Sequence, residues 1–311
     1  MKKWIFGLLF IAVIAIGSIY IFIPGDITVS EVRNIKTFRA AVAKLLTSKE
    51  KINQCFGNVA TKTDSSFKYK GFTFSISKII FNGNVIDITS DAINVQSNLI
   101  PLEMTTDSSS LHWVAAIHAG SNPFNRIKYY YAATKLKESM AGLMDEMKTY
   151  LEHPLNIYGI EVTEIRLKDS VLISTKSNSS HEPGVDEIYK QVKKLQDYAA
   201  SQGAAATNSP MLNVRQVDSS HFEFMVGLPV DKKITETTDI HIKFMPPGGK
   251  MLITEIKGGP NTIRNSMKLF DIYKEDAKKT SPAIPFELLI TNRATVPDTS
   301  KWITRLYYPV M

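Results

Sequence analysis

Residues 250–273, KMLITEIKGGPNTIRNSMKLFDIY, decide how the second half of this 311-residue chain folds. The apolar-rich run MLITEI favours a strand, and a Gly-Gly-Pro turn follows it. Proline suits the first position of a helix, and the apolar residues after it recur at helical spacing. A shift of 75 residues aligns the helix of this stretch with the helix in residues 170–198, SVLISTKSNSSHEPGVDEIYKQVKKLQDY, which also begin with an apolar-rich strand. The same strand and helix are therefore encoded twice.

The two copies match at the positions that a helix would bury and at residues that precede or follow the helix. The aligned pairs are Gly184 with Gly259, Ile188 with Ile263, Val192 with Met267, Leu195 with Phe270, Tyr198 with Tyr273 and Pro210 with Pro285. Two further strands follow each helix, residues 211–217 and 221–230 in the first copy and residues 286–292 and 302–310 in the second. We expect two strand-helix-strand-strand repeats, about residues 160–230 and 240–311, with both helices on one side of an antiparallel sheet.

This arrangement resembles the GyrI-like small-molecule-binding domain, the effector-binding domain of AraC- and MerR-type regulators, over residues 158–311. The local signals are KGGPNTI, the strand PFELL and the closing W-x-T-x-x-Y-x-P-V. The chain departs from the family at Leu289, where an aromatic residue is usual, and at Arg305, where Glu often follows Thr304. The resemblance implies a ligand cleft between the two repeats, lined by aromatic residues and faced by the glutamate that corresponds to Glu287.

Glu287 also stands out from the residues alone. It interrupts the apolar run FELLI, whereas its repeat mate is Leu212. An unpaired buried carboxylate is costly, so a cationic or hydrogen-bonding ligand would explain it; the alternative is a strand residue facing solvent. Glu223, between Phe222 and Phe224, is a second candidate with the same alternative. The candidate cleft walls, which core packing would explain equally well, are Phe286, Trp302, Tyr307 and Tyr308.

The first half, residues 27–154, predicts a meander of strands that ends in a long helix. Residues 72–77 alternate strictly, and Asn82-Gly83 is a hairpin turn signal. Ser121 or Asn122 can cap the last helix, and Pro123 suits its first position. The segment resembles the START-like (SRPBCC) superfamily of helix-grip folds at Asn122-Pro123-Phe124, Gly142-Leu143 and Met147-Lys148. The resemblance implies a cavity for hydrophobic ligands, although LTSKEKINQCF stands where related proteins have a Trp-rich stretch; a purely structural half is the alternative.

The N-terminus predicts a membrane anchor. Lys2 and Lys3 precede Trp4–Ile23, which contains no charge and no proline. About 20 apolar residues span the ~30 Å hydrocarbon core, and this run is longer than the apolar region of a cleaved signal peptide. We expect residues 1–26 to form an uncleaved single-pass anchor and a short tether, with the START-like half at 27–154 and the GyrI-like half at 155–311. An extracytoplasmic (periplasmic) body is favoured, although basic residues lie on both sides of the span.

Composition narrows the function. The net charge of +7 is spread along the chain, which favours a solvated surface over a nucleic-acid footprint. Cys55 is the single cysteine, and His112 and His118 have no third ligand nearby in sequence, so we expect no metal and no cofactor. We predict a membrane-anchored protein that binds a small hydrophobic or amphipathic molecule and has no DNA-binding domain, more probable as a binding protein than as an enzyme. The alternatives are a small-molecule hydrolase with Glu287 as general base, and a structural protein that binds a protein partner.

Overall fold

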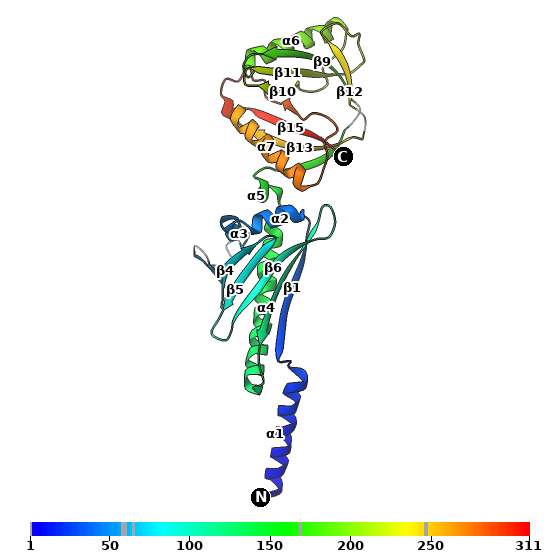
Figure 1. Cartoon of the computed structure of the whole chain (residues 1–311). Helices are drawn as coiled ribbons and strands as arrows, with labels where there is room; N and C mark the ends of the chain where they lie inside the picture. The colour runs from blue at the N-terminus through cyan, green and yellow to red at the C-terminus, as the bar shows by residue number, and fades with distance from the viewer. Residues whose placement is uncertain (1, 57–60, 64–65, 168–169, 246–247) are drawn as a thin grey trace. The chain divides into compact units, whose positions relative to one another are not determined.

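The chain folds as a mixed α+β protein with two antiparallel sheets in a computed structural model, as the alternating and helical patterns predict. The structure describes residues 2–56, 61–63, 66–167, 170–245 and 248–311. The chain divides into two compact units, residues 1–157 and residues 158–311 (Figure 1). Each unit is described by itself below.

Seven strands form the sheet of the first unit, in the order β1-β7-β6-β5-β4-β3-β2. They are β1 (Asp26–Ile35), β2 (Thr61–Thr63), β3 (Ser66–Tyr69), β4 (Phe72–Ile80), β5 (Gly83–Thr89), β6 (Asn94–Glu103) and β7 (Ser109–His118). From β2 to β7, each strand pairs with the next along the chain, and β1 pairs antiparallel with β7. The predicted hairpin is present between β4 and β5.

The long helix of the first unit, α4 (Pro123–Leu151), begins as the sequence predicts. Asn122 is its N-cap, and its side-chain oxygen accepts hydrogen bonds from the backbone N–H groups of Phe124 and Asn125. The helix packs against β1 through a buried stripe at helical spacing that includes Leu136, Met140 and Leu143. The shorter helices are α2 (Arg39–Leu46), α3 (Lys49–Cys55) and α5 (Pro154–Tyr158), whose last residue is the first of the second unit.

Aromatic rings occupy the interior of the first unit. Phe56 stacks on Phe67 with ring centroids 4.0 Å apart, and Phe67 stacks on Phe74 at 5.2 Å. Phe74 in turn lies 5.6 Å from Trp113, and all four side chains are fully buried. The START-like resemblance implies a ligand cavity in this half. The chain's own side chains fill the core where these four rings meet.

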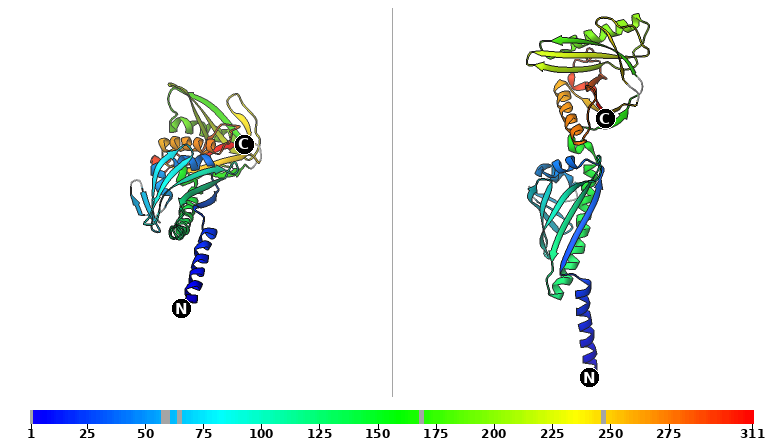
Figure 2. Two further views of the ribbon diagram at one scale, coloured as in Figure 1. Left: turned by 60° about the horizontal axis from the view of Figure 1, so that its bottom comes forward. Right: turned by 45° about the vertical axis from the view of Figure 1, so that its right-hand side comes forward.

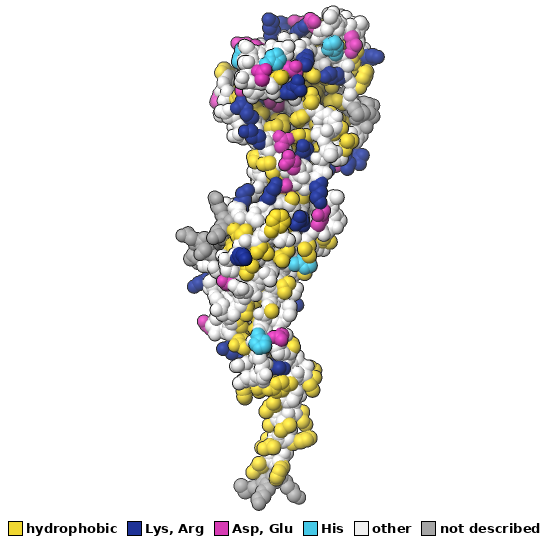
Figure 3. Space-filling model, in the orientation of Figure 1, with side chains coloured by type: hydrophobic (Ala, Val, Ile, Leu, Met, Phe, Trp, Pro, Cys, Tyr) yellow, Lys and Arg dark blue, Asp and Glu magenta, His cyan; other side chains and the backbone are white. Residues whose placement is uncertain are grey.

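The N-terminal helix α1 (Lys2–Phe22) carries the apolar segment. Residues Trp4–Phe22 have a mean hydropathy of 2.7 and are long enough to cross a membrane. None of the apolar window is buried in the protein, and its hydrophobic side chains cover the surface of the helix on the face shown in Figure 3. By length and composition this helix could span a bilayer.

Eight strands form the sheet of the second unit, in the order β12-β9-β11-β10-β14-β15-β13-β8. They are β8 (Thr163–Arg166), β9 (Ser170–Ser179), β10 (Met211–Asp218), β11 (His221–Val230), β12 (His241–Met245), β13 (Lys250–Lys257), β14 (Phe286–Leu289) and β15 (Ile303–Val310). The first repeat supplies β9, β10 and β11, the second supplies β13, β14 and β15, and the two meet where β10 pairs with β14.

Two short edge strands, β8 and β12, exchange between the repeats. β8 lies at the start of the first repeat but pairs with β13 of the second, whereas β12 lies at the start of the second repeat and pairs with β9 of the first. The sequence pattern does not predict either strand. Their exchange links the two repeats at both edges of the sheet in addition to the central β10–β14 pairing.

The two aligned glycines lie at equivalent places. Gly184 is the N-cap of α6 (Val185–Ser201), and Gly259 is the N-cap of α7 (Pro260–Asp276). Pro260 occupies the first turn of α7, so the sequence KGGP is the turn that leads into a helix, as predicted. Gly258 has a φ of 147°, which favours glycine, and its N–H donates to the carbonyl of Trp302. The duplication inferred from the sequence is thus present in the fold.

The two faces of this sheet differ. α6 packs on β9 and β11, and α7 packs on β13, so both helices cover what we call the helix face (Figure 2). Phe224, Val226 and Leu228 of β11 pack on this face with Ile188, Val192 and Leu195 of α6. The opposite face, which we call the open face, carries the alternate residues of the same strands. β14 ends at Leu289, three residues before the predicted end of that strand.

Candidate functional site

A hollow of about 700 Å³ lies on the helix face, where the two repeats meet. Its walls come from the first turns of α6 and α7 and from β10, β11 and β14, and they include Ile188, Leu212, Phe222, Ile263, Met267 and Trp302. The volume falls within the range of roughly 300–1,000 Å³ typical of small-molecule pockets. Because each repeat supplies one helix and one central strand, the duplication itself creates this cleft.

Glu287 lies at the centre of the cleft. It pairs with Leu212 across the β10–β14 ladder, so the two repeat mates stand side by side at the junction of the repeats. Directly opposed residues of an antiparallel pair point to the same face, and both side chains line the cleft. The Glu287 side chain is 19% exposed.

The charge of Glu287 is, however, compensated from within the chain. Nη2 of Arg293 donates to a carboxylate oxygen of Glu287 at 2.7 Å and to the Thr304 hydroxyl at 2.8 Å. The Arg293 side chain is 7% exposed, so the ion pair is largely desolvated. The expectation of an unpaired carboxylate is therefore wrong. The arginine follows β14 by four residues in a turn, and no periodic pattern marks such a partner.

Hydrogen bonds to α6 hold the segment that carries Arg293. The Tyr189 hydroxyl accepts from the backbone N–H of Arg293 at 2.7 Å and donates to the carbonyl of Thr291 at 3.3 Å. Because Tyr189 belongs to the first repeat and Arg293 to the second, this contact crosses the junction of the repeats. The ion pair at the centre of the cleft is thus positioned by both repeats.

Two of the predicted aromatic walls line the cleft. Trp302 is almost fully buried; its indole N–H donates to the carbonyl of Val296 at 2.8 Å, and the Arg293 guanidinium lies 4.8 Å from its ring. Phe286 borders the cleft and stacks on Tyr307 with ring centroids 4.9 Å apart. Trp302 therefore joins an apolar wall to the ion pair.

The other predicted walls lie elsewhere. Tyr308 packs edge-on against Phe270 of α7, and burial raises the pKa of its hydroxyl to about 12. It belongs to the core beneath α7 and not to the cleft lining, so its prediction as a wall is wrong. Tyr307 stacks on Phe286 and borders a smaller hollow that adjoins β8 and β10.

Glu223 is not a cleft residue. It pairs with Arg215 across the β10–β11 ladder, on the face away from the helices. Its carboxylate accepts from Arg215 at 2.7 Å and contacts Lys176 at 3.1 Å, and these bonds lower its pKa. The alternative stated for Glu223, an outward-facing strand residue, describes its position in the structure.

A second ion pair, which the sequence does not single out, borders the cleft. Glu182 precedes α6, Arg264 lies in the second turn of α7, and the guanidinium donates to both carboxylate oxygens at 2.5 and 2.6 Å. Both residues line the cleft and both side chains are about half exposed. This ion pair joins the two repeats at the border of the cleft.

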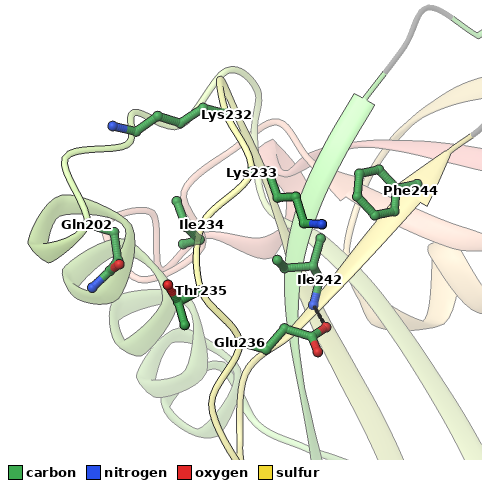
Figure 4. A pocket seen from close by; sticks show the side chains of 8 residues that line it. All are labelled: Gln202, Lys232, Lys233, Ile234, Thr235, Glu236, Ile242 and Phe244. Carbon is green, nitrogen blue, oxygen red and sulfur yellow. Dashed lines mark hydrogen bonds between the residues drawn. The ribbon is translucent and has the colours of Figure 1, made fainter.

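Other hollows of this unit have different linings. One of about 730 Å³ lies between the C-terminal end of α6, the segment 232–236 and β12 (Figure 4). Its lining includes Lys232, Lys233 and Glu236, and Glu236 accepts from the backbone N–H of Ile242 at 2.7 Å. Among the residues that the structure describes, no group of three His, Cys, Asp or Glu side chains is placed to hold a metal ion.

No protein-family model and no curated protein matches the chain, whereas several solved structures resemble part of it. The C-terminal domain of EcmrR is 14% identical with a TM-score of 0.42, covering 49% of this chain and 98% of that domain. A hydrolase from Listeria innocua is 11% identical with a TM-score of 0.37, covering 48% and 91%. SAV2435 bound to tetraphenylphosphonium is 15% identical with a TM-score of 0.32, covering 49% and 94%. At this level of similarity, function is argued from the geometry of the cleft.

Proposed function

We propose that the second unit binds a small apolar or amphipathic molecule in the cleft between its repeats. The observation that carries this proposal is the cleft itself, about 700 Å³ in volume, walled by apolar side chains from both repeats, with one buried ion pair at its centre. Pockets with mostly apolar walls and a few fixed polar groups are typical of small-molecule sites. Apolar burial supplies affinity, and the Glu287–Arg293 pair supplies orientation.

The charges favour a neutral amphipathic ligand over a simple cation. Each carboxylate of the cleft, Glu182 and Glu287, has an arginine partner within the cleft. A cation is therefore not needed to balance either carboxylate. A ligand with hydrogen-bonding groups can approach Glu287 and Arg293 without separating them, whereas a cation that displaced Arg293 would leave a buried guanidinium without its counter-charge.

The same pairing speaks against the hydrolase alternative. A general base must accept a proton, and proton uptake by Glu287 would remove the counter-charge of Arg293 in a largely desolvated position. We therefore propose a binding role for this carboxylate and not a catalytic one.

We further propose that residues 158–311 form a GyrI-like domain, that the first unit is a START-like structural partner, and that α1 anchors the protein in a membrane with its body extracytoplasmic. The strand-helix-strand-strand duplication supports the first assignment, and the meander closed by α4 supports the second. The exposed apolar surface of Trp4–Phe22 supports the third.

Intrinsic fluorescence tests the cleft, because Trp302 lies in its wall. The chain has only two other tryptophans, Trp4 in α1 and Trp113 in the core of the first unit. We expect a neutral aromatic amphiphile to quench the Trp302 component of the full chain in nanodiscs, and tetraphenylphosphonium to serve as the cationic comparison. Trp302→Phe should remove the response and Trp113→Phe should keep it. If Trp302→Phe leaves the response intact, or neither probe produces one, the cleft is not a ligand site.

A further inference from the structure

The open face of the second sheet contains a hollow of its own. Its volume is about 750 Å³, and an adjoining hollow of about 320 Å³ shares Leu167, Met211, Met245 and Phe286 with it. Strands from both repeats line it, from the edge strand β12 to β13 and β15. The hollow borders the cleft, because Leu212, Asn213 and Phe286 line both. Alternation along the strands places its other residues on the open face: Met211, Met225 and Gly227 point away from the helices, whereas Phe224 and Val226 belong to the helix-side core.

Methionine dominates this lining. Five of the eleven methionines of the chain border the larger hollow, namely Met211, Met225, Met245, Met251 and Met311. Unbranched thioether side chains adapt to ligands of varied shape, and surfaces rich in methionine accept flexible apolar partners. Gly227 adds room, because a Cβ there would lie 3.0 Å from Leu172 and 3.6 Å from Met211. The hollow therefore suits a flexible hydrocarbon chain better than a rigid polar molecule.

One cation at the hollow, Lys243, has no anionic partner among the residues that the structure describes. Lys243 pairs with Leu172 across the β12–β9 ladder, so its side chain lies on the open face, and its ammonium group contacts the thioether of Met225 at 2.9 Å. Among the described residues, no ion pair joins Lys243 to a carboxylate. Glu223, two residues from Met225, is held by Arg215 and Lys176 instead. By contrast, Lys250 at the same hollow contacts Glu164 at 3.5 Å.

We propose that this open-face hollow is a second binding site, for a single-chain amphiphile with an anionic head group such as a long-chain carboxylate. The hydrocarbon chain lies along Met211, Met225 and Met251, and the carboxylate accepts hydrogen bonds from the ammonium group of Lys243. The head group supplies an anion for Lys243, which has none among the described residues, and the chain covers apolar surface that faces away from both helices. The site neighbours the cleft but does not depend on the function proposed for the cleft.

Photo-crosslinking tests the site in the full chain reconstituted in nanodiscs. The probe is hexadecanoic acid with a diazirine in its chain, and the labelled peptides are identified by mass spectrometry. We expect label on the strands that carry Met211, Met225 and Met251. Lys243→Glu should reduce that label about three- to tenfold, because it turns an attraction at a partly exposed site into a repulsion. Lys190→Glu, the same charge change on the exposed surface of α6, should leave it unchanged.

Two further labelling experiments test whether Lys243 recognises the charged head group and whether the open-face label is independent of the cleft. The alcohol analogue of the probe should label the wild type and Lys243→Glu equally, because it carries no charge for Lys243 to recognise. Trp302→Phe should leave the open-face label unchanged, whatever it does to ligands of the cleft. Label confined to cleft peptides, equal labelling of Lys243→Glu and the wild type by the acid, or crosslinks from this face to a second copy of the chain would each overturn the proposal.

Discussion

Removing Arg293 is expected to destabilise the second unit strongly. In Arg293→Met, the carboxylate of Glu287 loses its cationic partner and the Thr304 hydroxyl loses a donor. Hydrogen bonds to charged groups contribute about 1.5–3 kcal/mol each, and breaking one side of a buried ion pair costs about 3–5 kcal/mol. Because Glu287 is 19% exposed and water can reach it in part, we expect the lower end, a loss of about 3 kcal/mol.

This loss of stability corresponds to a measurable decrease in Tm. For a unit of about 150 residues, each kcal/mol changes Tm by about 2–4 °C, so Arg293→Met should lower Tm by about 6–12 °C. The melt is followed through Trp302 fluorescence, since the Arg293 guanidinium lies 4.8 Å from that ring. Trp302→Phe assigns the transition to this unit. Lys190→Met, at an exposed position of α6, is the control for loss of a cation and should change Tm by less than about 2 °C.

A double-mutant cycle isolates the pair. Glu287→Leu alone leaves the Arg293 guanidinium buried without its counter-charge and should also destabilise the unit. The double variant, Glu287→Leu with Arg293→Met, places an apolar residue beside Leu212, as the repeat symmetry suggests, and should recover most of the lost stability. A shift below about 2 °C for Arg293→Met, or strictly additive losses in the double variant, would refute the reasoning.

Three further predictions concern stability. Gly83→Ala should destabilise the first unit by about 2–3 kcal/mol, because the added Cβ would overlap with the Leu99 carbonyl oxygen. A denaturant titration followed by Trp113 fluorescence measures this loss. The control, Asn82→Ala, should change the stability little, and equal effects of the two variants would contradict the steric argument. Tyr158→Phe should lower the stability of the second unit by about 2 kcal/mol, because the buried Tyr158 hydroxyl donates to Asp276 at 3.0 Å. A loss of stability as small as that caused by Tyr130→Phe, at an exposed position, would refute the importance of this hydrogen bond. Hydrogen bonding from Lys279 lowers the pKa of Glu164. The stability that Glu164 contributes is therefore fully present above its ordinary pKa of 4.5 and is lost as the pH falls through the lowered pKa. Glu164→Gln should flatten the decrease of Tm at acid pH, and an unchanged decrease would exclude this contribution of Glu164.

Local patterns predicted the elements that depend on neighbours in sequence. The glycines that begin α6 and α7, the buried helical stripes and the Asn122 cap each depend on residues within a turn or two, so the periodicity indicates them directly. Gly83 shows the limit of this approach. The dipeptide Asn82-Gly83 signalled a turn, but the structure requires glycine there because β6 approaches its backbone closely and not because φ is positive.

The sequence by itself determined the duplication and the fold class, because these follow from spacing along the chain. The cleft between the repeats, with Glu287 facing it, was expected from the family resemblance. Only the tertiary structure decided what surrounds that carboxylate. Arg293 reaches it through a turn, Tyr189 reaches that turn from the other repeat, and β8 and β12 pair across the repeats. The methionines of the open face likewise gather from separate strands. Such contacts join residues distant in sequence, and no local period records which distant side chains the folded sheet brings together.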